Sequence, residues 1–208
     1  MPVQLTAAAL WLNTFFAAFD ESVAILEHKL YQIAGPVMSP IMEFISFLGN
    51  DGICLIIISV LLMIPKKTRP YGTAMLLGLA IGALFTNLWL KVVIARPRPY
   101  VDETKIFHQI WMTMGQHMES DKSFPSGHTT AAFASMVPLF IMGKKNISWL
   151  ALVFAVLMGI SRIYLGVHYA SDVIGGIIVG SLAGLIGYFV ASKLPAIYYN
   201  YKLQLPKR

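Results

Sequence analysis

The sequence predicts an all-α protein, a polytopic transmembrane helical bundle of five spans with an N-terminal interfacial helix, for which a sixth span is the alternative. Of the 208 residues, 57% are hydrophobic and only 12% are charged, whereas charged residues make up about a quarter of a soluble domain. Several apolar stretches approach the roughly 20 residues that a membrane helix needs. Basic residues stand at the ends of these stretches rather than along one polar face, which excludes a nucleic-acid binder.

Residues 1–35 are expected to form an amphipathic segment. Apolar residues such as Trp11 and Phe15 alternate with polar ones, and charged residues follow over Asp20–Lys29 at helical spacing with apolar ones. A helix with separate apolar and charged faces lies in the membrane interface. We therefore expect residues 1–35 to lie on the membrane, residues 36–198 to form the transmembrane domain, and residues 199–208 to be a basic cytoplasmic tail.

Five apolar segments supply the expected spans. They are Ile41–Ile64, with an interruption at Gly49–Gly52; Tyr71–Ala95; Gly127–Met142, which is short; Ile147–Ile160, extended to Val167; and Val173–Ala191. Glycines recur four residues apart at Gly78 and Gly82, and again at Gly176, Gly180 and Gly184. Small residues at this spacing let membrane helices approach closely, so the pattern predicts tight packing of the second and fifth spans.

The basic residues orient this bundle. If the five spans alternate, nine Lys and Arg residues fall on one face of the membrane and seven on the other. Three of the seven, Lys91, Arg98 and Arg162, belong to polar clusters, which leaves nine against four. Because Lys and Arg collect on the cytoplasmic side, we expect the polar clusters to face outward, in a bacterial inner (cytoplasmic) membrane.

The first polar cluster is Ser161–Asp172, in which Arg162 ends one apolar stretch and Asp172 opens the next. Charges at such depth are costly and usually mark a site. His168 and Asp172 are four residues apart, so on a helical turn they share a face. A carboxylate there can fix the tautomer of the ring, which leaves the other nitrogen free as a base or nucleophile. The structural alternative is a helix–loop–helix corner with an incidental histidine and a capping aspartate.

The second polar cluster is Lys91–Pro99, at the end of Tyr71–Ala95. Lys91 and Arg98 are seven residues apart, or two helical turns, and can project toward one point if the helix continues. An ammonium and a planar guanidinium together suit a phosphate group. The alternative is that both side chains reach toward lipid headgroups. Arg96 is assigned to this alternative or to a supporting role.

The third polar cluster, Ser123–Thr130, begins the third expected span. Ser126 and Gly127 indicate a helix start, where free N–H groups and the helix dipole favour an anion. Gly127 lets the backbone approach a ligand closely, Ser126 adds a hydroxyl donor, and His128 is placed to protonate a departing oxygen. The alternative is that Ser126 only caps the helix and His128 lies in the interface.

Together the clusters provide a lysine, two arginines, a helix N-terminus, two histidines and an aspartate on one expected face. These groups suit phosphoryl transfer: cations bind the phosphate oxygens, one histidine attacks and the other protonates the leaving group. Asp102, Glu103, Glu119 and Asp121 are loop residues without the spacing of a metal cage. We therefore expect no metal and no other cofactor, and transfer through a phosphohistidine.

The connection Tyr100–Lys122 is long for a loop without structure of its own. We expect it to be a lid over the site, with Trp111, Met112 and Met114 dipping into the lipid.

The three clusters resemble the signature of the type 2 phosphatidic acid phosphatase family, which is related to the vanadium haloperoxidases. Lys-x6-Arg-Pro, Pro-Ser-Gly-His and Ser-Arg-x5-His-x3-Asp are matched at every defining position, within 91–99, 125–128 and 161–172. The resemblance implies a helical bundle whose active site lies at the membrane surface and removes phosphate from a lipid. It also implies the following roles: His168 as nucleophile, Asp172 as the residue that orients it, His128 as general acid, and Lys91, Arg98, Ser126, Gly127 and Arg162 as phosphate binders.

These features predict an integral membrane phosphatase whose partners are a lipid phosphate and the bilayer, with no nucleic acid. Undecaprenyl diphosphate is the first expected substrate, because an outward site suits recycling of a carrier lipid released there. Phosphatidylglycerol phosphate and phosphatidate come next. Two other classes remain: a vanadate-dependent haloperoxidase, against which the spans argue, and a non-catalytic lipid transporter or binding protein on the same fold.

Overall fold

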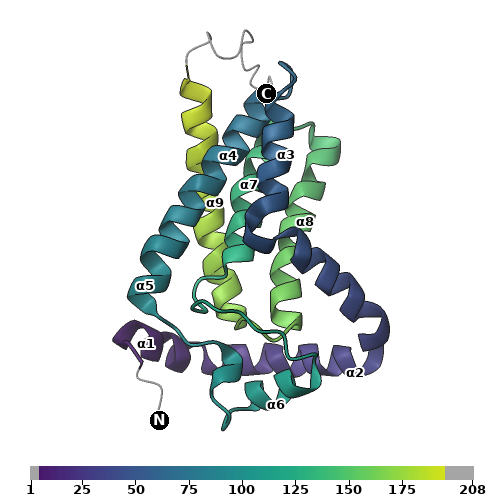
Figure 1. Ribbon diagram of the computed structural model, residues 1–208, viewed down its shortest axis with the longest axis vertical. Helices are drawn as coiled ribbons and strands as arrows, with labels where there is room; N and C mark the ends of the chain where they lie inside the picture. The colour runs from purple at the N-terminus through teal and green to yellow at the C-terminus, as the bar shows by residue number, and fades with distance from the viewer. Residues whose placement is uncertain (1–4, 195–208) are drawn as a thin grey trace.

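The computed structural model describes residues 5–194, which fold into helices with no strand among them (Figure 1). The all-α prediction is confirmed. The α-helices are α1 Ala7–Phe15, α2 Ala17–Leu48, α3 Ile53–Met63, α4 Arg69–Ala83, α5 Lys91–Ile94, α6 Ile106–Thr113, α7 Gly127–Met142, α8 Lys145–Tyr164 and α9 Ala170–Lys193. Three short turns of other helix types are η1 Asn50–Gly52, η2 Leu84–Leu90 and η3 Pro99–Val101. The expected tail 199–208 lies outside the described residues.

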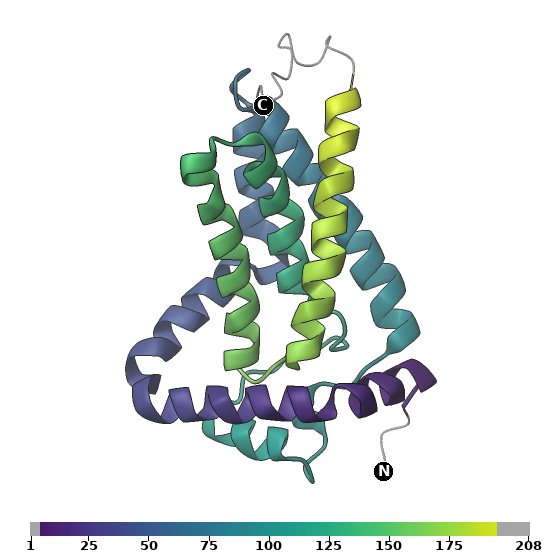
Figure 2. The same cartoon turned by 180° about the vertical axis from the view of Figure 1, so that it is seen from behind.

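Helices α3, α4, α7, α8 and α9 run side by side as an elongated bundle (Figures 1 and 2). Helix α9 packs closely on α4 and α7 because glycines line the contact. A Cβ atom on Gly78 would lie 2.3 Å from the carbonyl oxygen of Ala134 and 3.2 Å from Cα of Gly184, and one on Gly180 would lie 2.5 Å from the carbonyl oxygen of Thr130. The tight packing that the glycine spacing predicts is therefore confirmed.

Three helices in the described part of the chain are long and apolar enough to cross a membrane. They are Arg69–Val101, Lys145–Tyr164 and Ala170–Lys193, and the bent pair α1–α2 raises the number to as many as four. These three coincide with the second, fourth and fifth expected spans. Helix α7 has the predicted bounds but only 16 residues, so the count of five spans is not confirmed.

The first expected segment, Ile41–Ile64, is interrupted at Gly49–Gly52 as predicted, and the interruption divides it between two helices. Helix α2 ends at Leu48, and α3, with 11 residues, begins only at Ile53. Between them Asp51 and Gly52 have φ angles of 49° and 67°, in the left-handed region that interrupts a right-handed helix. The Gly-Asn-Asp-Gly sequence at 49–52 supplies the residue types that adopt this conformation most readily.

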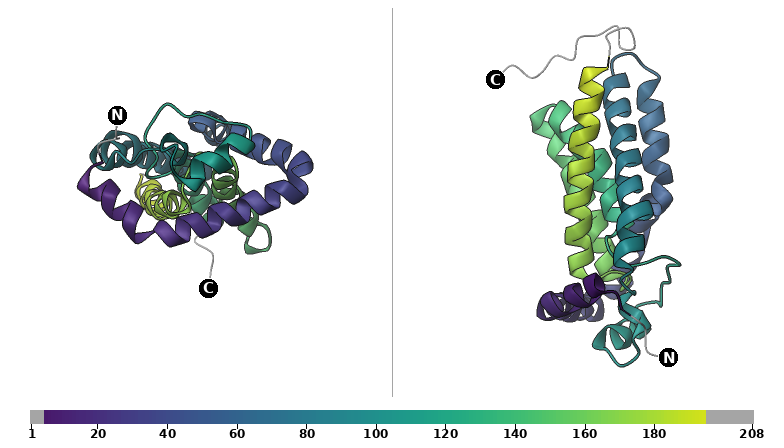
Figure 3. Two further views of the ribbon diagram at one scale, coloured as in Figure 1. Left: turned by 90° about the horizontal axis from the view of Figure 1, so that it is seen from below. Right: turned by 90° about the vertical axis from the view of Figure 1, so that its left-hand side faces the viewer.

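Helix α1 and the first part of α2 lie across one end of the bundle, and the last part of α2 turns toward α3 (Figures 2 and 3). Helices α1 and α2 meet at a bend of 63°, and α2 continues past Gly35 to Leu48. Trp11 and Phe15 of α1 are 57% and 67% exposed. The site-bearing ends of α5, α7, α8 and α9 gather at this same end of the bundle, which α2 and α6 cover.

The loop Tyr100–Lys122 contains α6 and packs partly on itself. Trp111 is 8% exposed and Met114 4%, whereas Met112 is 49% exposed. Trp111 stacks on Tyr100 with ring centroids 4.8 Å apart, and its Nε1 donates to the carbonyl of His117 at 2.7 Å. The expectation that this segment dips into lipid is therefore wrong for Trp111 and Met114, which form part of an internal core.

Candidate active site

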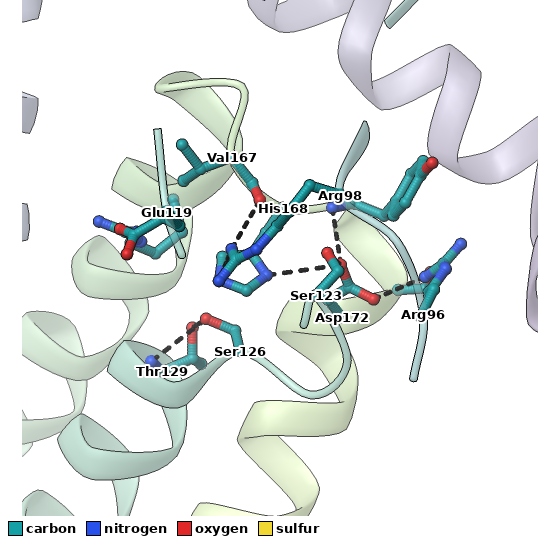
Figure 4. A network of polar contacts seen from close by, with 12 residues as sticks. Arg96, Arg98, Glu119, Ser123, Ser126, Thr129, Val167, His168 and Asp172 are labelled. Atoms are coloured by element: carbon teal, nitrogen blue, oxygen red, sulfur yellow. Dashed lines mark hydrogen bonds and ion pairs between the residues drawn. The ribbon is translucent and has the colours of Figure 1, made fainter. Parts of the chain in front are cut away.

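A cavity of about 560 Å³ opens where α5, the start of α7 and the loop before α9 meet α3 and α4. Five of the eight site residues predicted from the sequence line it: Lys91, Arg98, Gly127, His128 and His168. The other three, Ser126, Arg162 and Asp172, are buried beside lining residues, at 0%, 3% and 0% exposure. The structure thus brings all eight to one end of the bundle, and Figure 4 shows Arg98, Ser126, His168 and Asp172 among them.

Lys91 and Arg98 converge, although not by the route that the spacing suggested. Helix α5 ends at Ile94, Ala95 has a φ angle of 50°, and the chain is extended at Arg98. The expectation of a helix continuing to Arg98 is therefore wrong. The two side chains nevertheless meet, because both pair with the carboxylate of Asp121.

The start of α7 presents its backbone to the cavity. Ser126 is the N-cap: its Oγ accepts from the backbone N–H and the hydroxyl of Thr129, at 3.4 and 2.9 Å. The Ser126 hydroxyl proton thereby remains available to donate. A Cβ atom on Gly127 would lie 3.3 Å from Nζ of Lys91, so glycine at this position leaves room beside the ammonium. The capping role and the anion-binding role of this turn are compatible.

His168 lies in the loop before α9, with its ring between Arg98 and Asp172 (Figure 4). Its Nδ1 is 3.4 Å from Oδ2 of Asp172, and its Nε2 is 2.8 Å from Nη1 of Arg98. A guanidinium only donates hydrogen bonds, so Nε2 must be the acceptor and Nδ1 carries the proton. This tautomer leaves the lone pair that could attack a phosphorus atom on Nε2, at the cavity.

The surroundings of His168 favour the neutral ring. Burial is the first reason that the pKa of His168 lies well below 6.5, and the positive charges of Arg98, Arg162 and Lys91 lower it further. A neutral imidazole can act as a nucleophile, whereas a protonated one cannot. The ring is therefore in its reactive form at neutral pH.

Asp172 has four hydrogen-bond donors around its carboxylate. Oδ2 accepts from the backbone N–H of Tyr169 at 3.0 Å and from the hydroxyl of Ser123 at 2.5 Å, besides facing His168. Oδ1 accepts from Nη1 of Arg96 at 2.6 Å. The carboxylate caps the first turn of α9 and also faces the imidazole. Asp172 is therefore both the helix cap and the partner of His168, the two roles that the sequence analysis treated as alternatives.

Arg162, in the last turn of α8, also faces the site. Its Nη1 donates to Oγ of Ser46 and its Nη2 to Oε1 of Glu119. Its Nε is buried and has no hydrogen-bond partner among the described residues. A buried guanidinium with a spare donor is suited to a further acceptor such as a phosphate oxygen.

Two acidic residues that the sequence placed in an ordinary loop belong to the site. Asp121 pairs with Lys91 and Arg98, and its backbone carbonyl accepts from Nε of Arg98 at 3.0 Å. Glu119 pairs with Arg162. Burial alone would raise the pKa of Asp121, but the hydrogen bond and charge of Lys91 and the charge of Arg98 outweigh it and keep the pKa below the ordinary value. Both carboxylates line the cavity.

The structure gives Arg96 the supporting place that the sequence analysis left open, and it adds Asp20, whose importance the sequence did not reveal. Arg96 is 1% exposed and joins Asp172 to Asp20 of α2, at 2.6 and 2.9 Å. Asn13 and Asp20 both accept from Arg96, but they stand in different helices across the bend between α1 and α2, so helical spacing does not signal this contact.

The arrangement suits in-line attack on a phosphoryl group held by three cations and the N-terminus of α7. Nε2 of His168 is one possible attacking atom, and His128 lines the same cavity. Among residues 5–194, no cluster of three or more His, Cys, Asp or Glu side chains could hold a metal ion.

Comparisons with known proteins agree with this geometry. The profile of the PAP2 superfamily matches residues 71–195. The chain is 33% identical over 154 residues to undecaprenyl-diphosphatase BcrC of Bacillus subtilis, covering 72% of this chain and 73% of that protein. It is 33% identical over 191 residues to phosphatidylglycerophosphatase B of the same organism, covering 86% and 85%.

A solved structure is also similar. The crystal structure of a transmembrane PAP2-type phosphatidylglycerolphosphate phosphatase from Bacillus subtilis matches with a TM-score of 0.59 and 28% identity, covering 91% of this chain and 98% of that one. The match of the profile to more than half of the chain, together with the three clusters around one cavity, establishes that this protein belongs to the PAP2 superfamily.

Proposed function

We propose that this protein, a multi-pass membrane lipid phosphatase, releases phosphate from a lipid phosphomonoester or diphosphate through a phosphohistidine at His168, without a metal ion. The observation that supports this proposal most strongly is the placing of the Nε2 lone pair of His168 at a cavity that Lys91 and Arg98 line and beside which Arg162 is buried. Undecaprenyl diphosphate is the first proposed substrate, and phosphatidylglycerol phosphate and phosphatidate follow. The relatives named as undecaprenyl-diphosphatase and phosphatidylglycerophosphatase support this order of candidates without deciding between them.

The first chemical step forms a bond between Nε2 of His168 and phosphorus. The bond from phosphorus to the bridging lipid oxygen breaks, and that oxygen takes a proton from His128. Lys91, Arg98 and Arg162 neutralise the charge on the phosphoryl oxygens, and the N–H groups at the start of α7 add to this effect. Asp172 stabilises the positive charge that develops on the ring of His168.

The second step restores the enzyme. A water molecule attacks phosphorus, His128 takes a proton from it, and the bond between phosphorus and Nε2 breaks. Inorganic phosphate leaves, and Arg98 returns to its contact with Nε2. Arg98 donates to that nitrogen at 2.8 Å, so substrate phosphate must draw the guanidinium away before attack can occur.

The apolar wall of the cavity suits the lipid part of the substrate. Ile56 of α3 and Leu76 and Leu79 of α4 line the cavity. The phosphate would then lie among the cations while the first part of the lipid chain contacts these residues. Burial of apolar surface of this kind contributes about 25 cal/mol per Å².

The proposed orientation places the site on the outer face of a bacterial cytoplasmic membrane. The α3–α4 and α7–α8 connections, which carry Lys66, Lys67 and Lys144, lie at the opposite end of the bundle from the site (Figure 1). The positive-inside rule assigns such basic ends to the cytoplasm. A C-terminal fusion to a reporter that is active only in the periplasm should give no signal, and a strong signal would overturn this orientation.

The function can be tested with purified protein in detergent containing EDTA, by measuring phosphate release from a panel of lipid monophosphates and diphosphates. We expect release that survives EDTA and is lost in His168→Ala, with the highest kcat/KM on a diphosphate. The control is Glu21→Gln, on the exposed side of α2. Release that requires added metal would refute the proposed mechanism, and no release from any lipid would refute the function.

A further inference from the structure

The first part of helix α2 contacts the active-site residues through Asp20, which pairs with the buried Arg96. Asp20 of α2 is 2% exposed, and its Oδ2 accepts from Nη2 of Arg96 at 2.9 Å. Its carboxylate also accepts from the backbone N–H and the hydroxyl of Ser171, at 2.8 and 2.7 Å. Asp20 is therefore attached both to the segment that carries Arg98 and to the first turn of α9.

The guanidinium of Arg96 is fixed on several sides. Nη1 donates to Oδ1 of Asp172 at 2.6 Å and to Oγ of Ser171 at 2.7 Å, and Nε donates to Oδ1 of Asn13 at 2.8 Å. The guanidinium carbon lies 3.8 Å from the centroid of the Tyr169 ring. A planar group held along two edges and one face has little freedom to rotate.

The backbone of Arg96 adds a second link to the same carboxylate. Its carbonyl accepts from the N–H of Ser123 at 2.8 Å, and the hydroxyl of Ser123 donates to Oδ2 of Asp172 (Figure 4). Arg96 thus controls one oxygen of Asp172 directly and the other through Ser123. It does not line the cavity, and its guanidinium contacts the catalytic pair at Asp172.

We propose that Arg96, held in place by Asp20, is a positioning residue for the Asp172–His168 pair, so that the N-terminal helix α2 is a working part of the active centre. This inference rests on the proposed nucleophilic role of His168. Arg96 fixes the direction of the carboxylate that faces Nδ1 of His168, and Asp20 offsets part of the charge that Arg96 brings. Neither Asp20 nor Arg96 falls in a motif position, and Asp20 lies outside the residues that the family profile matches.

Because Arg96 and Asp20 carry opposite charges, removing one or the other should shift the protonation of His168 in opposite directions. Asp172 favours protonation of His168, whereas Arg98, Arg162, Lys91 and His128 oppose it. Removing the positive charge of Arg96 leaves the carboxylate of Asp172 uncompensated, so His168 should gain a proton at higher pH. Removing the negative charge of Asp20 leaves Arg96 uncompensated, so His168 should gain its proton at lower pH.

The test compares Arg96→Gln, Arg96→Lys and Asp20→Asn with the wild type on one lipid phosphate, over a pH series of kcat and KM. For Arg96→Gln we expect kcat to fall about 10- to 100-fold, KM to stay within about threefold, and the acidic limb of kcat/KM to rise by about one pH unit. Arg96→Lys keeps the charge, so its acidic limb should stay in place. For Asp20→Asn the limb should move to lower pH.

The controls separate positioning from simple loss of folding. Glu21→Gln changes a neighbouring, exposed residue of α2 and should leave kcat and the acidic limb unchanged. If Arg96→Gln cannot be purified in folded form, the opposite shift in Asp20→Asn still tests the proposal. Shifts of the same sign in both variants, or unshifted limbs in both, would overturn it. An inactive wild type would instead refute the proposed function.

Discussion

The carboxylate of Asp121 occupies the position among the cations where substrate phosphate is proposed to bind. It pairs with Lys91 and Arg98 together, so an incoming phosphate must displace it. Replacement by Asn keeps the size and a hydrogen-bonding group but removes the charge. We therefore expect Asp121→Asn to bind inorganic phosphate more tightly than the wild type.

The size of this effect follows from the contacts. Hydrogen bonds between charged groups contribute roughly 1.5–3 kcal/mol each, but the side chain of Asp121 is 47% exposed, and solvent screens such pairs strongly. If the Asp121 carboxylate competes with phosphate for these cations by about 1.4 kcal/mol, its removal changes the affinity for phosphate tenfold. The inhibition constant of inorganic phosphate should fall by about tenfold.

The assay is inhibition of turnover by added phosphate, followed through the dephosphorylated lipid so that the inhibitor does not interfere with detection. The matched control is Asp102→Asn in the same loop, whose carboxylate accepts hydrogen bonds from Thr104 rather than facing the cations. Its inhibition constant should equal that of the wild type. Unchanged or weaker inhibition in Asp121→Asn would refute the reasoning, because the carboxylate would then not compete with phosphate.

Four further predictions concern the histidine pair and the packing of the bundle. Because burial and then nearby cations hold the pKa of His168 well below 6.5, the acidic limb of kcat/KM should lie below pH 6.5; a limb above that value would contradict it. The same depressed pKa means that the unfolded state binds the proton more tightly, so stability should fall as pH drops below about 6.5. Asp172→Asn should lower kcat by about 10²- to 10⁴-fold, since Nδ1 loses the partner that fixes its proton; near-normal kcat would show that the carboxylate is dispensable. Gly180→Ala should destabilise the protein by about 1–3 kcal/mol, because its Cβ would lie 2.5 Å from the carbonyl oxygen of Thr130. The loss can be measured by thermal unfolding in detergent, with Leu182→Ala, on the exposed side of α9, as the control.

Much of the site was predictable because the chemistry is concentrated at helix ends. Spacing alone placed His168 opposite Asp172 and indicated that Ser126 and Gly127 begin a helix. Residue spacing cannot, however, show where a helix stops. The left-handed turn at Ala95 ends α5 four residues before Arg98 is reached, and only the structure shows that an extended segment still brings the guanidinium to Lys91.

The residues that the sequence did not reveal act across long distances in the chain. Asp20 and Arg96 are 76 residues apart, and Asp121 and Lys91 are 30 apart. No periodic pattern reports such pairs, because each charge taken alone resembles an exposed residue of an amphipathic helix or loop. The broken helix at Gly49–Gly52 was visible as a composition change, but its consequence, a wall of the cavity, depends on tertiary packing.

The central claim is that Nε2 of His168 becomes covalently phosphorylated during turnover. The most direct measurement mixes the enzyme, in EDTA, with a lipid labelled in its terminal phosphate, quenches in alkali within milliseconds, and locates protein-bound label by mass spectrometry. A phosphohistidine should appear at His168, survive alkali, be lost in acid, and be absent from His168→Ala. Turnover without any protein-bound phosphate, or label that persists in His168→Ala, would contradict the account.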